Sequence, residues 1–279
     1  MTQHATTRFE ISSDEGLPIR GVIEIPTNPL ALVVTIHGFK GFKDWGFFPW
    51  TSESFAEAQI ASCRFDMSRC GITEGSETFD RLDLFADDTY SVELADLERV
   101  IAHVRSVDDL SALPLFLFGH SRGGAIAILG ARTIDRVDGV ITWSSIATLR
   151  RWDDATIARW RRDGFLDVEN LRTKQTMRMS TRLLDDLDAN RERLDLEKAL
   201  GGLALPMLVL HGASDESVPV EEATEIHDAA DNASMVVIES ATHTYGAIHP
   251  LVTVPRELRL AMAITRQFIQ SWTPSRDEE

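Results

Sequence analysis

Short apolar runs recur along the chain, each closed by turn or polar residues. They have the length of strands and are rich in β-branched residues, as in ALVVTI at 31–36. This run and LPLFLF at 113–118 lack polar alternation, which is typical of strands buried on both faces of a parallel sheet. The strand-like runs lie at 7–11, 20–25, 31–36, 62–67, 113–118, 137–142, 206–211 and 234–239.

Helical patterns separate most of these runs. The clearest pattern places Leu94, Leu97, Ile101 and Val104 at three- and four-residue spacing, behind an acidic start that suits a helix N-terminus. Strand and helix in alternation predict an α/β fold, with a mostly parallel sheet and helices on both faces. The first two runs have no helix between them, so we expect them to form an antiparallel hairpin at one edge.

One long stretch interrupts this alternation. Residues 146–200 are crowded with Arg and Asp and contain no strand-like run. We predict a helical cap inserted over the carboxyl ends of the strands, with the core formed by 1–145 and 201–279. The alternative is a longer set of helices packed on the sheet edge. Arginines of this stretch lie near similar numbers of carboxylates, which favours a solvated face over a surface for acidic substrates. Examples are Arg150, Arg151, Arg161 and Arg162.

The strongest chemical signal is Gly119-His120-Ser121-Arg122-Gly123. It follows the run 113–118 directly and precedes a small-residue helix that begins Gly124-Ala125-Ile126-Ala127. A G-x-S-x-G sequence between a strand and a helix indicates a nucleophile elbow, in which glycines allow a tight turn that projects the serine oxygen above the sheet. The helix N-terminus favours developing negative charge beside this serine. The alternative is a glycine-rich turn that only packs the helix on the strand.

With this motif, the chain resembles the α/β-hydrolase superfamily over nearly its whole length. The resemblance also rests on His37-Gly38-Phe39 after the run 31–36, on His211-Gly212 with Asp215, and on His243. It implies an eight-stranded sheet and a triad in the chain order serine, acid, histidine. Among the members, the sequence is most similar to bacterial carboxylesterases, including the feruloyl (cinnamoyl) esterases, whose oxyanion loop is likewise H-G-F.

Asp215 is the expected acid of the triad. It lies in a turn after the run 206–211, where a carboxylate can accept a hydrogen bond from the imidazole and stabilise its cation. Its rival is the neighbouring Glu216, and a carboxylate that only stabilises the turn is the alternative.

His243 is the expected general base, because it follows the last strand-like run on a loop that can reach the elbow. His249, six residues further on, is the main competitor. The remaining histidines are expected in other turns, on helices or in the N-terminal tail: His37, His120, His211, His103, His227 and His4.

The resemblance also implies that the backbone amides of Phe39 and Arg122 form the oxyanion hole. The alternative for His37-Gly38 is a simple strand-end turn. An aromatic cluster follows this loop, and such clusters belong to the core more often than to an acyl pocket. Its members are Phe42, Trp45, Phe47, Phe48 and Trp50. For Arg64, Asp66 and Arg69 we expect structural ion pairs.

Charge narrows the set of partners. The 44 acidic and 28 basic side chains give a formal charge of −16, which repels nucleic acids and anionic membranes. The polar start at 1–10 and the absence of a long apolar run favour a cytoplasmic protein. Cys63 and Cys70 suit neither a disulfide nor a metal site, and no nucleotide-binding motif is present, so no metal or other cofactor is expected.

Together these observations predict a serine carboxylesterase that acts through an acyl-enzyme on small acyl or aryl, feruloyl-like, esters. The same triad also serves peptidases, C–C bond hydrolases and perhydrolases, and a non-catalytic binding protein can share the fold. The expected partner is a small-molecule ester; the oligomeric state is left open, a homodimer included.

Overall fold

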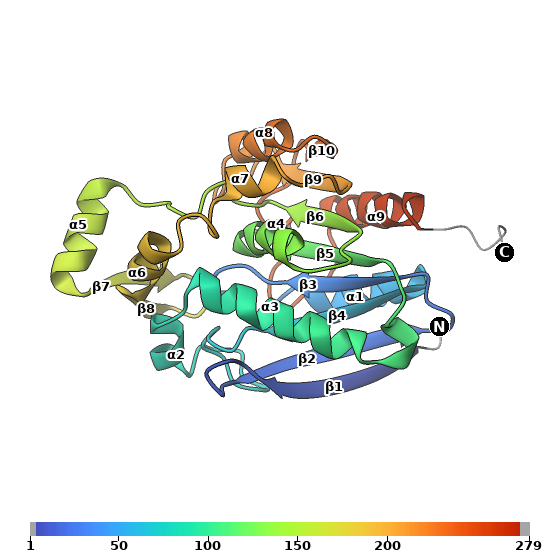
Figure 1. The fold of residues 1–279 in the computed structure, drawn as a ribbon, viewed down its shortest axis with the longest axis horizontal. Coiled ribbons are helices and arrows are strands. Elements are labelled where there is room, and N and C mark those ends of the chain that lie inside the picture. Colours follow the sequence, from blue (N-terminus) through green and yellow to red (C-terminus); the bar gives the residue numbers. More distant parts are fainter. Residues whose placement is uncertain (1–3, 274–279) are drawn as a thin grey trace.

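An eight-stranded sheet forms the centre of the molecule, in the computed structural model that describes residues 4–273 (Figure 1). The expected core segments 1–145 and 201–279 begin and end outside the described residues. The predicted α/β architecture with a mostly parallel sheet is confirmed. The strands are β1 (His4–Ser12), β2 (Pro18–Pro26), β3 (Ala31–Ile36), β4 (Ile60–Asp66), β5 (Leu115–His120), β6 (Gly139–Trp143), β9 (Met207–Gly212) and β10 (Ala233–Ile238).

The strand order is β1-β2-β4-β3-β5-β6-β9-β10. β1 and β2 pair as the predicted antiparallel hairpin at one edge, and β2 is also antiparallel to β4. The remaining pairs are parallel, so the carboxyl ends of β3, β5, β6, β9 and β10 meet at one edge of the sheet. In parallel sheets this is the edge where ligands bind.

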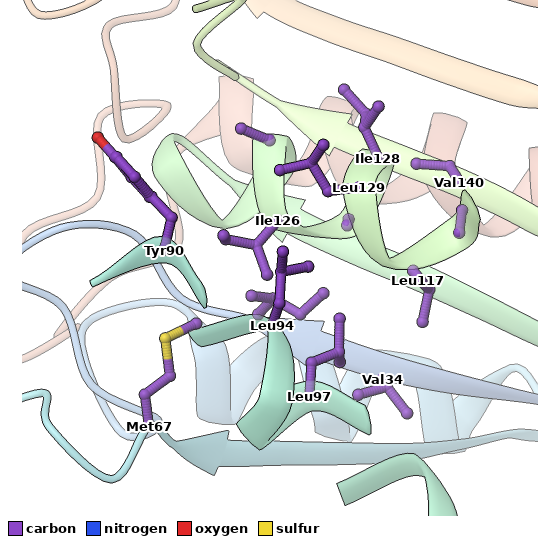
Figure 2. Close-up of a cluster of buried hydrophobic side chains, with 14 of the residues drawn as sticks. Val34, Met67, Tyr90, Leu94, Leu97, Leu117, Ile126, Ile128, Leu129 and Val140 are labelled. Atoms are coloured by element: carbon purple, nitrogen blue, oxygen red, sulfur yellow. The ribbon is translucent and has the colours of Figure 1, made fainter. Parts of the chain in front are cut away.

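Successive residues of the buried strands face opposite helical layers. Val33 belongs to the apolar cluster that includes Phe55 of α1 (Phe48–Glu57) and Met262 of α9 (Arg256–Ser271). Its neighbour Val34 belongs to the other cluster, with Leu97 of α3 (Tyr90–Arg105) and Ile126 of α4 (Arg122–Thr133) (Figure 2). Two apolar layers explain why these strands carry no polar alternation. The helices of the core are α1 (Phe48–Glu57), α2 (Leu82–Ala86), α3 (Tyr90–Arg105), α4 (Arg122–Thr133), α8 (Val220–Ala229) and α9 (Arg256–Ser271).

The segment between β6 and β9 is not purely helical, which corrects the expectation for 146–200. It contains α5 (Asp154–Asp163), α6 (Arg182–Ala189) and α7 (Leu196–Leu200), but also an antiparallel hairpin of β7 (Phe165–Asn170) and β8 (Gln175–Ser180). Met177 and Met179 are buried, while Arg178 between them is exposed and pairs with Asp167 on β7. This alternation gives the hairpin one apolar face, and its charged residues hid the strands from a search for apolar runs.

The β7–β8 hairpin docks on loops of the core. Gln175 accepts a hydrogen bond from the backbone nitrogen of Phe79 at 3.1 Å and donates one to its oxygen at 2.8 Å. The ammonium of Lys40 donates to the backbone oxygen of Glu169 at 2.9 Å, and the guanidinium of Arg172 lies 5.6 Å from the centre of the Phe42 ring. The hairpin is therefore attached to the loop that follows β3.

The arginines of this segment lie in exposed ion pairs. Arg150 and Arg161 both reach Asp188, and Arg162 pairs with its neighbour Asp163. Arg151 instead reaches back to Glu222 on α8. These contacts agree with the predicted solvated face. Among residues 4–273, no helix combines the length and the apolar character that crossing a bilayer requires.

Asp96 on α3 makes stability depend on pH. It is buried, and within residues 4–273 only its Oδ2 has a hydrogen-bond partner, the backbone nitrogen of Ser68 at 2.7 Å. Burial raises the pKa of Asp96 to about 6, against about 3.9 in an unfolded chain. The folded state therefore holds this proton more tightly, and the stability that the proton contributes is lost as pH rises through 6.

We expect Asp96→Asn to become more stable than wild type as pH rises from 4 to 7, by about 2–3 kcal/mol at pH 7. Urea unfolding at pH 4, 5, 6 and 7 measures the difference. Asp154→Asn, at an exposed helix position, is the matched control. A difference between Asp96→Asn and wild type that stays constant over this range would contradict the assignment.

Candidate active site

Ser121 occupies a sharp turn between β5 and α4. Its backbone has φ 56° and ψ −123°, an unusual conformation for a residue with a side chain. A Cβ on Gly119 would overlap the carbonyl oxygen of Gly123, and one on Gly123 would overlap that of Ile36. Only glycine fits at these two positions, so the G-x-S-x-G spacing is a consequence of the close approach of strand, helix and loop.

The loop after β3 lies directly against this turn. A Cβ on Gly38 would come within 2.9 Å of the Cβ of Ser121. Within residues 4–273, the amide nitrogens of Phe39 and Arg122 have no hydrogen-bond acceptor, and Arg122 is the first residue of α4. The Arg122 amide follows Ser121 directly in sequence, and the Phe39 amide follows Gly38, which lies against Ser121. The dipole of α4 favours negative charge beside Arg122.

The ring of Phe39 is held between two side chains. The Arg122 guanidinium carbon lies 4.1 Å from its centroid, and the Phe85 ring stacks at 5.3 Å. Arg122 is buried and its guanidinium contacts the carboxylates of Glu93 at 3.2 Å and Asp88 at 3.5 Å. Burial acts against its charge, but these carboxylates and Tyr90 outweigh it and raise the pKa of Arg122. The cation that holds Phe39 is therefore permanent.

Asp215 and His243 are hydrogen-bonded to each other. The Nδ1 atom of His243 lies 2.8 Å from the Asp215 carboxylate, whose side chain has no exposed surface. The other oxygen of this carboxylate accepts from the backbone nitrogens of Ser217 and Val218, each at 2.9 Å. The carboxylate accepts a hydrogen bond from Nδ1–H, which leaves the Nε2 lone pair of His243 available as a base.

His211 supports the same carboxylate, a role that the sequence did not indicate. It is fully buried at the end of β9, and its Nε2 lies 2.9 Å from the Val218 oxygen and 3.4 Å from Asp215. Burial opposes ionisation of Asp215, but the hydrogen bonds from His211 and His243 outweigh it and keep the pKa of Asp215 well below its usual range. Asp215 is therefore an anion throughout the neutral range.

His120 connects the elbow to the loop of His243, which the sequence also did not indicate. Its Nε2 donates to the backbone oxygen of His243 at 2.9 Å, and the two rings lie 4.8 Å apart. Burial, together with the nearby His243, lowers the pKa of His120 to about 3, so the ring is neutral near pH 7. The residue before Ser121 thus contacts the backbone of the candidate base.

Close packing joins the loops of Asp215 and His243. A Cβ on Gly212 would overlap the carbonyl oxygen of Ala241, and the same oxygen accepts from the backbone nitrogen of Ser214 at 3.0 Å. The sequence model of the alpha/beta hydrolase family matches residues 33–257, which include all these loops. The chain belongs to the alpha/beta hydrolase family. The predicted resemblance is confirmed, and membership supports hydrolase chemistry.

Solved structures with this fold include esterases. Est1E from Butyrivibrio proteoclasticus is 20% identical with a TM-score of 0.69, and the match covers 95% of this chain and 98% of that one. The structure of Est1E with bound ferulic acid is 21% identical with a TM-score of 0.70, and the match again covers 95% of this chain and 98% of that one. The esterase domain of a Rhodothermus marinus protein is 19% identical with a TM-score of 0.63, covering 96% and 97%. A comparison with curated proteins gives no sequence match.

The competing residues of this alpha/beta hydrolase have other surroundings. The Nδ1 atom of His249 accepts from the backbone nitrogen of Gly46 at 2.8 Å, and its Nε2 is buried without a partner in the described chain. His249 therefore presents no lone pair to Ser121, whereas Glu216 is exposed. In the aromatic cluster, Phe42, Phe47 and Phe48 are buried, as the core interpretation predicts.

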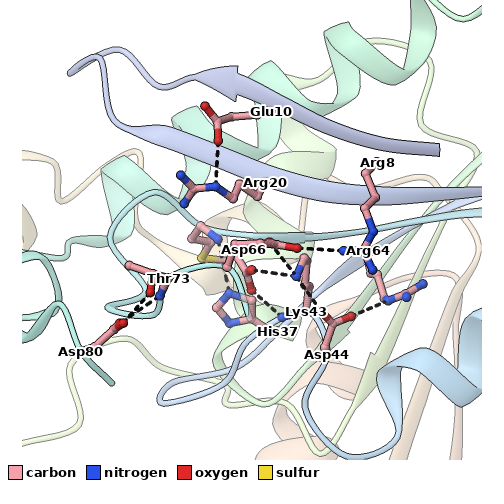
Figure 3. A network of polar contacts seen from close by, with 12 residues as sticks. Arg8, Glu10, Arg20, His37, Lys43, Asp44, Arg64, Asp66, Thr73 and Asp80 are labelled. Atoms are coloured by element: carbon pink, nitrogen blue, oxygen red, sulfur yellow. Dashed lines mark hydrogen bonds and ion pairs between the residues drawn. The ribbon is translucent and has the colours of Figure 1, made fainter. Parts of the chain in front are cut away.

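A largely buried polar network connects the loop after β3 to β2 and β4 (Figure 3). Arg64 pairs with Glu24 at 2.5 Å and with Asp44 at 3.2 Å, while the ammonium of Lys43 lies 3.4 Å from Asp66. Arg69 pairs separately with Glu15 at 2.5 Å. These structural ion pairs fit the expectation for Arg64, Asp66 and Arg69. Those of Arg64 and Asp66 attach the loop after β3 to β4.

Three residues of this alpha/beta hydrolase could together hold a metal ion. The side-chain donor atoms of His37, Asp66 and Cys70 lie within 4.8 Å of one another. Burial raises the pKa of the Cys70 thiol well above its usual range, and the ammonium of Lys43 already supplies the positive charge beside Asp66. Burial disfavours that ammonium, but Asp66 and Asp44 outweigh it and raise the pKa of Lys43. This arrangement opposes a second cation there.

A cavity of about 840 Å³ lies apart from these residues. It is lined by 147–150, by residues of α6, α7 and α8, and by the α6–α7 connection. It contains neither Ser121 nor His243, so we do not assign the substrate to it.

Proposed function

We propose that the protein is a serine carboxylesterase with Ser121 as nucleophile, His243 as general base and Asp215 as the orienting acid. The observation that carries the proposal is the strained turn of Ser121, whose neighbour His120 donates a hydrogen bond to His243 at 2.9 Å. Strained backbone of this kind is common at functional sites. The Asp215–His243 hydrogen bond supplies the second half of a triad.

In this mechanism Nε2 of His243 takes the proton of Ser121 as its oxygen attacks the ester carbonyl. The carbonyl oxygen becomes an oxyanion, which accepts hydrogen bonds from the amides of Phe39 and Arg122. His243 then gives its proton to the departing alcohol, leaving an acyl-enzyme. Water, deprotonated by His243, attacks the acyl group and releases the acid with Ser121 restored.

The proposed substrates are small acyl or aryl esters. Support comes from the similar structure described as Est1E with bound ferulic acid. Here, the ring of Phe39 lies beside the elbow, held by Arg122 and Phe85. A flat, apolar side chain next to the proposed oxyanion hole suits an acyl group with little bulk.

A panel of p-nitrophenyl esters from acetate to laurate, with methyl ferulate and an aminoacyl anilide, tests this function. We expect hydrolysis of esters, with higher kcat/KM for the short or aryl acyl groups, and labelling by a fluorophosphonate probe. Hydrolysis of the anilide alone would indicate a peptidase. Heat-denatured protein is the labelling control, and absence of both labelling and turnover in the folded protein would favour a binding protein.

His120 should position the base without taking part in proton transfer. We expect His120→Leu to lower kcat/KM about tenfold with little change in KM, because the His243 carbonyl loses a buried donor worth about 1–3 kcal/mol. His120→Gln, which retains a donor at a similar reach, should recover much of the loss. Steady-state kinetics on one p-nitrophenyl ester measures both variants; equal losses would contradict a role for the hydrogen bond.

A further inference from the structure

Lys40 follows the proposed oxyanion donor Phe39 and has strained backbone. Its φ is 58°, in the left-handed region that is uncommon for residues other than glycine, asparagine and aspartate. Such a conformation costs on the order of 1 kcal/mol or more, and strained residues cluster at functional sites. The Lys40 side chain reaches the β7–β8 hairpin, where its ammonium donates to the backbone oxygen of Glu169.

The ammonium of Lys40 lacks a salt bridge within the described chain. Its hydrogen bond goes to the backbone oxygen of Glu169, and the carboxylate of Glu169 accepts from the hydroxyl of Thr176. An ammonium has three donors, so two of them remain for other partners. The ammonium lies over the ring of Phe39, the aromatic residue beside the elbow, at 5.4 Å from the ring centroid.

Neighbouring cations contact carboxylates directly, whereas Lys40 has only the more distant carboxylate of Glu169. Lys43 lies within 4 Å of Asp44, Asp66 and Glu74, and Arg122 contacts Asp88 and Glu93. Lys40 is half-buried. Burial, as the larger cause, and repulsion from Arg122 lower the pKa of Lys40. A partly desolvated cation beside a second cation is stabilised when an anion approaches.

We propose that Lys40 forms a subsite for an anionic group of the ester substrate, so that the preferred esters carry a free carboxylate. This inference rests on the proposed esterase function. The carboxylate would accept hydrogen bonds from the two remaining donors of Lys40 while the ester carbonyl lies at the amides of Phe39 and Arg122. The positive charge of Arg122, 4.1 Å from the centre of the Phe39 ring, adds to the attraction.

The net charge of the protein and a local cationic subsite predict opposite effects of salt on an anionic substrate. A protein of formal charge −16 repels an anionic ester, and added salt should weaken that repulsion and favour the anionic substrate. A local cationic subsite predicts the opposite effect of salt, because screening weakens the attraction to Lys40. The direction of the salt effect therefore separates the subsite from the average field of the molecule.

The test compares mono-p-nitrophenyl adipate with p-nitrophenyl methyl adipate, which differ in one negative charge. The measured quantity is the ratio of kcat/KM for the anionic ester to that for the neutral ester. We expect a wild-type ratio above 1 that falls as NaCl rises from 20 to 500 mM. Lys40→Asn should lower the ratio about tenfold at low salt, since asparagine tolerates the left-handed backbone, and Lys40→Arg should retain most of it.

Lys174→Asn is the matched control, because Lys174 is exposed and also has a left-handed φ of 56°. Its ratio should stay near the wild-type value. An equal ratio in wild type and Lys40→Asn, with both esters hydrolysed, would overturn the subsite and leave the esterase proposal standing. Hydrolysis of neither ester by wild type would overturn the esterase proposal, and the subsite with it.

Discussion

Ser121→Ala should fold like the wild type and lose ester hydrolysis by a factor on the order of 10⁶, the scale seen when a triad serine is removed. The variant keeps the Cβ at the strained turn, so its backbone conformation is as accessible as before. It loses only the oxygen that we propose attacks the carbonyl. Release of p-nitrophenol from the preferred short ester measures the loss, and circular dichroism with thermal unfolding checks the fold.

Ser214→Ala provides the control for removing a serine hydroxyl near the site. Ser214 lies in the turn after β9, and its hydroxyl makes one long contact of 3.4 Å to the oxygen of Glu239. This variant should retain activity and fluorophosphonate labelling, whereas Ser121→Ala should lose both. Near-wild-type hydrolysis by pure Ser121→Ala would remove Ser121 from the mechanism.

Asp215→Asn should lower kcat by about 10⁴-fold, as the equivalent change does in serine proteases. The asparagine oxygen can still accept from Ser217 and Val218, which places its NH₂ group toward His243. A donor at that position favours the His243 tautomer with the proton on Nε2, and this tautomer cannot accept the Ser121 proton. Measuring both kcat and the free energy of unfolding of the variant distinguishes loss of the general base from loss of the folded structure.

The neighbouring carboxylate gives the matched control for Asp215. Glu216 is exposed in the same turn, and Glu216→Gln removes one negative charge at the same place in the sequence. It should change kcat by less than about threefold, the effect of one screened surface charge. Comparable losses in Asp215→Asn and Glu216→Gln would show that charge near the turn matters and that a specific hydrogen bond does not.

The sheet and the elbow were predictable because their constraints are local. Buried parallel strands need continuous apolar runs, and the turn at Ser121 needs glycine on both sides, so each leaves a direct mark in the sequence. The β7–β8 hairpin was missed because Arg178 and Asp167 interrupt its apolar residues.

The links made by His120 and His211 could not be predicted. His120 donates to a residue 123 positions later, and His211 supports Asp215 only because the turn at 215–218 folds back over β9. Such contacts depend on strand order and loop path, which the pattern of apolar residues does not encode. The sequence does predict that Asp215 and His243 follow strands whose carboxyl ends share one edge. Their roles in catalysis remain predictions for the variants above.

The docking of the β7–β8 hairpin limits how this enzyme could be re-engineered. Gln175 binds the backbone of Phe79, and Glu169 binds the residue after Phe39, so the insertion is part of the frame that supports the loop after β3. Grafting the corresponding segment of a relative would exchange these anchors as well. A chimera would keep the loop after β3 in place only if the graft brings equivalents of Gln175 and of the Glu169 carbonyl.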